Sequence, residues 1–127
     1  MTPSVIVPAA QPDANPMKEY LDSLMRLETL PPDTLVLPSH GLPFRALHTR
    51  LAQMREHHLV RLDDVASVVT GKTTAFAVAQ EVFPRVLYAN PRQAFGEALA
   101  HLNMVSGVMS CSAERDKSKV CPPFRCR

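Results

Sequence analysis

A single histidine stands where the sequence changes from an apolar run to a helix signal. His40 lies in "LVLPSHGLPF", residues 35–44, and is followed by Gly41. Gly41 lets the backbone turn without a side chain in the way, and strand ends are where α/β proteins place reactive groups. An imidazole at such a turn can bind zinc, which needs three or four ligands in total. The alternative is an ordinary strand-to-helix turn that happens to contain a histidine.

The other histidines favour structural roles. His57 and His58 are adjacent in a helical pattern, so they point in different directions and do not easily reach one ion. His58 falls in the apolar stripe, which predicts a packed and hydrogen-bonded side chain. We expect His48 and His101 at the surface or in packing contacts. No H-E-x-x-H motif, phosphate loop or Ser/His/Asp set can be assembled from this sequence.

The three cysteines all lie in the last segment, as Cys111, Cys121 and Cys126. Their odd number argues against a disulfide framework. Their spacing contains no C-x2-C pair and so matches no common zinc pattern. We therefore expect free thiols.

Two short apolar runs near the start of the chain are strand candidates. "SVIVP", residues 4–8, lies between prolines that confine it to a sheet edge or an extended crossing. "TLVLP", residues 34–38, has three apolar residues in a row, which favours a strand buried on both faces. Two short strands do not make a stable sheet, so this front part resembles the edge of something larger.

Helical patterns fill most of the rest. Asn15 and Pro16 predict a cap and first turn, and Pro31 a stop. A long apolar stripe predicts a helix from Phe44 to about Val69, ended by Gly71. The stripe consists of seven residues: Leu47, Leu51, Met54, His58, Leu62, Val65 and Val69. Thr73 or Thr74 caps a short helix that closes before Pro84, and Pro91 opens another that ends at Gly107. The tail could form a hairpin with Cys111 opposite Cys121, and three helices followed by a hairpin is the order of a winged-helix module.

Composition limits the classes of partner. The 127 residues are enough for one domain, and the formal net charge of +2 is too small to indicate nucleic acid by itself. No apolar run approaches the roughly 18 residues that a membrane span needs. No basic region precedes an apolar core near the start, so a cytoplasmic protein is the expectation.

Three stretches resemble a known family. "DANPMKEYLDSLMRLETLPPDTLVLPSHGLPF", "HTRLAQMREHHLVRL" and "EALAHLNMVSGVM" are similar to the late part of metallo-β-lactamase-fold hydrolases. The most similar branch is the bacterial glyoxalase-II-like group, whose members carry a helical, winged-helix-like C-terminal extension. The resemblance covers roughly residues 2–109.

The resemblance implies a fold and a metal site. It implies edge strands and helices of an αββα sandwich in residues 1–43, an α/β remnant, followed by a mainly α, winged-helix-like extension in residues 44–127. Intact members bind two metal ions, usually zinc, through H-x-H-x-D-H, a later histidine, a bridging aspartate and a final histidine. His40 matches that final histidine and would bind the second metal. A metal-activated water would attack a carbonyl of an ester, thioester or lactone.

The departures from the family pattern decide what we expect of this chain alone. It contains no H-x-H-x-D-H, and His40 is its first histidine. One imidazole does not hold zinc tightly without partners. The sequence therefore predicts a C-terminal fragment of a hydrolase, inactive alone, with no catalytic residue of its own and a small acyl substrate in the intact enzyme.

Two alternatives stay open. The chain could be a structural fragment that docks on a missing N-terminal half, since an exposed "TLVLP" edge favours strand pairing. It could also be a winged helix on nucleic acid, with Arg92 opening the recognition helix. The helix after Pro91 has few side chains that read bases, and Glu97 lies near its middle, so nucleic acid is the less favoured partner.

Overall fold

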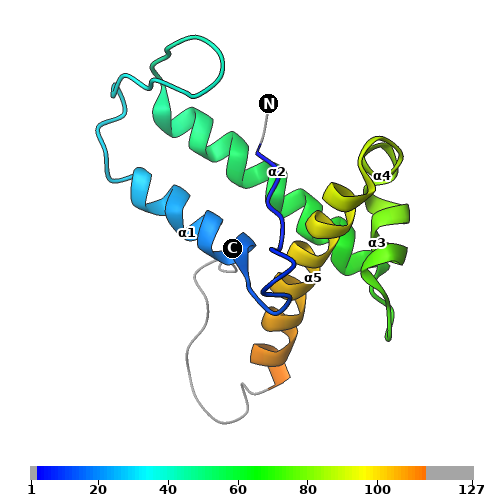
Figure 1. The fold of residues 1–127 in the computed structure, drawn as a ribbon. Helices are drawn as coiled ribbons and strands as arrows, with labels where there is room; N and C mark the ends of the chain where they lie inside the picture. Colours follow the sequence, from blue (N-terminus) through cyan, green and yellow to red (C-terminus); the bar gives the residue numbers. More distant parts are fainter. Residues whose placement is uncertain (1–2, 114–127) are drawn as a thin grey trace.

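A computed structural model describes residues 3–113, in which five helices follow one another. They are α1 (Pro16–Leu27), α2 (Leu47–Val68), α3 (Ala75–Val82), α4 (Pro84–Ala89) and α5 (Pro91–Ala113). The α5 helix packs against each of the other four, and Figure 1 shows α3 and α4 at the opposite end of α2 from the long loop that follows α1. The mainly helical part of the expected fold is confirmed, and the described residues contain no sheet.

Local capping rules explain where these helices begin. The Asn15 side chain accepts a hydrogen bond from the Lys18 amide at 3.0 Å, and Pro16 occupies the first turn. Thr74 caps α3 in the same way, accepting from the Ala77 amide at 3.1 Å. The α4 helix was not expected. Pro84 ends α3 and also opens α4, because proline fits a first helical position as well as it stops a preceding helix.

The strand predictions need correction. Residues 4–8 run as an extended segment with no strand pairing, and the Val7 amide donates to the Gly96 carbonyl oxygen of α5 at 3.2 Å. Of the two predicted states of residues 4–8, the extended crossing forms and the edge strand does not. "TLVLP" retains a single isolated bridge between Val36 and Phe44. A strand buried on both faces needs neighbours on both sides, and the described part of the chain supplies none, so Leu37 is 74% exposed.

The α5 helix also runs further than expected. It passes through Gly107 and continues to Ala113, so the prediction that Gly107 ends it is wrong. A glycine inside a helix costs only about 1 kcal/mol relative to alanine, and the flanking residues carry the helix through. The predicted hairpin arm at Cys111 is therefore helical backbone instead. The rest of that hairpin, with Cys121 and Cys126, lies outside the described residues.

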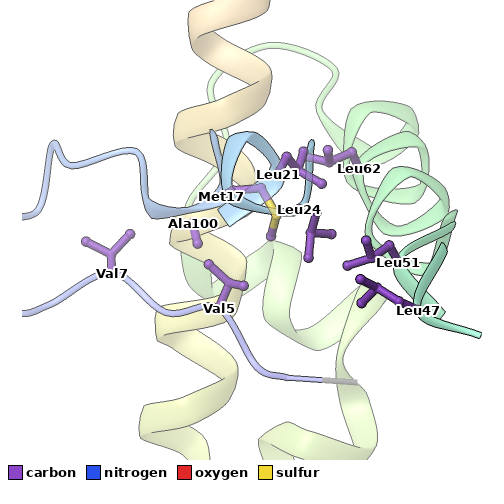
Figure 2. Close-up of a cluster of buried hydrophobic side chains, with 9 residues drawn as sticks. All are labelled: Val5, Val7, Met17, Leu21, Leu24, Leu47, Leu51, Leu62 and Ala100. Carbon is purple, nitrogen blue, oxygen red and sulfur yellow. The ribbon is translucent and has the colours of Figure 1, made fainter. Parts of the chain in front are cut away.

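Buried apolar side chains form two clusters that meet along α5. The first, drawn in Figure 2, joins the extended N-terminal segment and α1 to α2 and α5. Its buried members are Val5, Val7, Met17, Leu21, Leu24, Leu47, Leu51, Leu62 and Ala100. The second joins the end of α2 to α3 and α5 through Val65, Val78, Ala79, Phe83, Ala94 and Ala98. The helices α1, α2, α3 and α5 therefore each bury one face, whereas α4 has no buried residue.

Truncation of Leu21 tests the first cluster. Leu21 is fully buried, so Leu21→Ala should lower the free energy of unfolding by about 2–5 kcal/mol through lost burial and the cavity left behind. Leu42→Ala is the control, because Leu42 is 85% exposed and should change it by less than about 0.5 kcal/mol. Urea unfolding followed by circular dichroism measures both. Equal effects of the two changes would contradict the assigned core.

Two glycines of α5 test the contact with the N-terminal segment. A Cβ at Gly96 would lie 3.1 Å from Ile6 Cβ, whereas at Gly107 nothing is closer than 3.9 Å. Gly107→Ala should therefore stabilise by up to about 1 kcal/mol through helix propensity, and Gly96→Ala should fail to give that gain. The difference between the two urea midpoints is the measurement. A gain at Gly96 as large as at Gly107 would mean that the segment does not press on α5.

Candidate functional site

The sequence-predicted site residue lies in the loop between α1 and α2. His40 is exposed, and Gly41 beside it has φ +91°, the left-handed region that favours glycine. Val36 and Phe44 close the base of this turn with two backbone hydrogen bonds, of 2.8 and 3.1 Å. The turn that the sequence predicts at Gly41 is therefore present, and the imidazole is held at its tip and open to solvent.

Side chains from the neighbouring residues fasten this loop. Arg45 donates from Nη1 to the Asp33 carbonyl oxygen. The Nε2 atom of His48 lies 2.8 Å from the Leu30 carbonyl oxygen, which can only accept, so this nitrogen carries the proton. Both bonds tie the first turns around α2 to the exit from α1. His48 thus has the packing role that the sequence favoured.

The residues around His40 do not complete a metal site. Within residues 3–113, no three His, Cys, Asp or Glu side chains gather closely enough to hold a metal ion. Two leucines within three positions of it, Leu37 and Leu42, are exposed. A zinc ion needs three or four ligands, so His40 can offer one ligand and the described part of this chain cannot supply the rest.

Open hollows lie at two other places on the surface. An open hollow on the outer face of α1 is lined by Glu19, Asp22, Met25, Arg26 and Thr29. A second hollow runs from Phe44 to Gln53 along the start of α2. Neither includes His40 in its lining.

Each helix in the described part is too short or too polar to cross a bilayer.

Two histidines and a tyrosine lie together inside the helical bundle. His58 of α2 and His101 of α5 are 3% and 2% exposed, and the His58 ring contacts that of Tyr20 from α1. His57, the preceding residue, is exposed, and its ring contacts that of His58 edge to face at a centroid distance of 5.2 Å. The expected hydrogen bonding of His58 is wrong, since neither ring nitrogen has a partner among the described residues.

The sequence predicts a helix for each of these side chains, but it does not predict that the three converge. Tyr20 follows Met17 by three positions in the helix predicted after Pro16, and His58 lies in the apolar stripe of the next predicted helix. His101 follows Ala98 by three positions in the helix predicted after Pro91. A polar aromatic side chain in an apolar stripe was the available signal. Which stripes face one another depends on how the helices pack, and helical period alone does not decide that.

Known proteins similar to this chain share one family. No family model matches it. A stretch of 93 residues is 31% identical to the probable metallo-hydrolase YqjP of Bacillus subtilis (strain 168), covering 72% of this chain and 29% of that protein. A beta-lactamase domain protein from Burkholderia ambifaria is 44% identical with a TM-score of 0.72, over 83% of this chain and 31% of that one.

A metallo-beta-lactamase family protein from Thermus thermophilus agrees with them. It is 32% identical with a TM-score of 0.61, over 73% of this chain and 29% of that one. The chain is thus homologous to a part of metallo-beta-lactamase family proteins, and it spans about 30% of the length of these relatives. The family resemblance of the sequence is confirmed at this level, and the family is metal-dependent.

Arg45 tests how the loop around His40 is held. Arg45→Ala removes the bond to the Asp33 carbonyl, so the amides of Val36 and Phe44 should exchange with solvent faster. The bond is exposed, so the free energy of unfolding should fall by less than about 1.5 kcal/mol. Hydrogen exchange resolved by residue measures the first effect. Arg26→Ala, on the outer face of α1, is the control and should leave both amides unchanged.

Proposed function

We propose that this chain is the C-terminal part of a metal-dependent hydrolase and that His40 is one of its metal ligands. The metal would be zinc, and the acyl substrate an ester, thioester or lactone of the kind that glyoxalase-II-like hydrolases take. The remaining ligands would come from sequence that this chain does not contain. On its own the chain would not hydrolyse such substrates.

The observation that carries this proposal is homology across the His40 turn. The stretch matched to YqjP, 93 residues out of 127, contains His40 wherever it begins. The name of that relative is probable metallo-hydrolase. The imidazole stands at an open glycine turn, exposed to solvent and therefore accessible to a metal, which fits a ligand whose co-ligands lie elsewhere.

The apolar surface beside His40 supports docking on a missing N-terminal half. Leu35, Leu37 and Leu42 are 50%, 74% and 85% exposed, on both sides of the histidine in the sequence. Side chains of this kind are normally buried. The partner would be the larger part of the metallo-beta-lactamase fold, and the residues around Val36 would gain a neighbouring strand from it. The helical region from residue 44 onward would then be an extension that helps to choose the substrate.

A chimaera tests the metal ligand. The matched segment of the Burkholderia ambifaria protein is replaced by residues 3–113 of this chain, and zinc content and affinity are measured. The chimaera should bind zinc and hydrolyse a member of an ester, thioester and lactone panel. His40→Ala in it should weaken zinc binding by more than about 100-fold, since even loss of an outer partner of a ligand costs 10–100-fold.

His57→Ala in the same chimaera is the matched control, because His57 is an exposed histidine of α2. It should leave zinc affinity unchanged. Unchanged affinity in the His40 variant would overturn the proposed ligand. Stoichiometric zinc with turnover in the isolated 127-residue chain would overturn the proposal that further ligands are needed.

A further inference from the structure

Three helices bring a group of polar rings together in the interior. His58 from α2 lies between Tyr20 from α1 and His101 from α5, with ring centroids 5.0 and 6.1 Å from its own. The ring of Phe83, at the end of α3, lies 5.3 Å from that of His101. Both imidazoles are almost fully buried. The group therefore connects α1, α2, α5 and the end of α3.

The hydrogen bonding of this group is incomplete. The Nδ1 atom of His101 lies 2.7 Å from the Glu97 carbonyl oxygen and so carries the proton. The Nε2 atom of His101, both nitrogens of His58 and the hydroxyl of Tyr20 are buried without a partner among the described residues. A buried polar atom without a partner costs roughly 1–3 kcal/mol, and a buried charge without one costs more. The arrangement thus accepts a neutral His58 and opposes a charged one.

The buried rings lie where the two apolar clusters meet, so a charge there would affect how the helices pack. Tyr20 packs on the first apolar cluster, which includes α1, whereas Phe83 belongs to the second, which contains no α1 residue. His58 therefore lies at the seam between the two clusters. A charge at this seam would be relieved by moving α1 away, because that exposes the imidazole to water while the second cluster stays intact.

We propose that His58 is an acid-sensitive latch: its protonation releases α1 from α2 and α5 while α2, α3, α4 and α5 remain packed on one another. The groups facing it are Tyr20 of α1, His101 and Glu97 of α5, and His57 of α2 itself. Arg61 of α2 lies with its guanidinium 5.8 Å from the Phe83 ring centre, on the α3 side. Glu97 alone favours a charged His58, and its carboxylate already accepts from Gln93 at 3.0 Å.

The electrostatics set the direction of the response. Burial, and then the neighbouring His101 and His57, lower the pKa of His58 to about 4 from its ordinary 6.5. Burial also lowers the pKa of His101. The open state, with His58 in water, binds a proton more readily than the closed state. Docking of α1 is therefore fully stable above about pH 6.5 and weakens as the pH falls from there towards 4.

Hydrogen exchange of the full chain at pH 7.5 and 4.5 tests the latch. Protection is taken relative to the intrinsic exchange rate at each pH. In α1 it should fall on the order of 50-fold between the two conditions, from the two pKa values above, whereas the amides of Ala94 and Ala98 in α5 should keep theirs. Unchanged protection in α1, or an equal loss in all helices, would overturn the proposal.

Two variants assign the effect to His58. His58→Leu fills a similar space without a titratable group, so α1 should lose almost none of its protection in acid. Asp63→Asn, at an exposed titratable residue of α2 that is not among the groups facing His58, should behave as the original chain. An acid response in His58→Leu equal to that of the original chain would assign the effect elsewhere and overturn the latch.

A measurement on the unaltered chain covers the case in which His58→Leu does not fold. Imidazole carbon and nitrogen shifts followed by NMR report the titration of each histidine. The His58 signals of the closed chain should titrate below pH 5, whereas α1 protection should already begin to fall near pH 6.5. Titration of His58 near 6.5 in the folded chain would overturn the proposal.

Discussion

Close approach to α5 is the constraint on which the rest of the structure depends. Ala94, Gly96, Ala98 and Ala100 present almost no side chain, and all four are buried. Small residues let neighbouring backbones come near, so α3, α1 and the extended N-terminal segment can reach the same helix from different sides. Larger residues here would separate the two apolar clusters from α5. The packing of the bundle therefore depends on the small residues of α5 as much as on the large side chains of the helices around it.

Helix starts and buried stripes could be read from the sequence because they depend on local chemistry. Asn15, Thr74 and the prolines act within a few residues of themselves, and α2 buries five of the seven residues assigned to its stripe. The strand at "TLVLP" failed for the opposite reason. A strand is completed by its neighbours, and in the described residues Val36 pairs only with Phe44 in a single bridge. Gly107 misled because a glycine stops a helix only where the chain must leave it.

The candidate site could be predicted only in part, for the same reason. The turn at Gly41 follows from the residues that form it, and so does the exposure of an imidazole at its tip. Its chemistry would come from ligands supplied by distant sequence, and no pattern within 127 residues contains that information. The buried rings around His58 are the reverse case. Every member is in the chain, but their meeting depends on helix packing angles, which a helical period does not encode.

The extended N-terminal segment also bears on how the chain folds. Ser4 and Gln93 are joined by a hydrogen bond across 89 positions, and Val7 lies on Gly96 at the same separation. Bringing such distant residues together closes a loop of most of the chain, and the entropy lost in closing it is recovered only once α5 exists as a surface. Helix pairs near in sequence, such as α3 and α4, have no such delay. We therefore expect the segment to dock late in folding, together with the other contacts that join the two ends of the chain, such as those between α1 and α5.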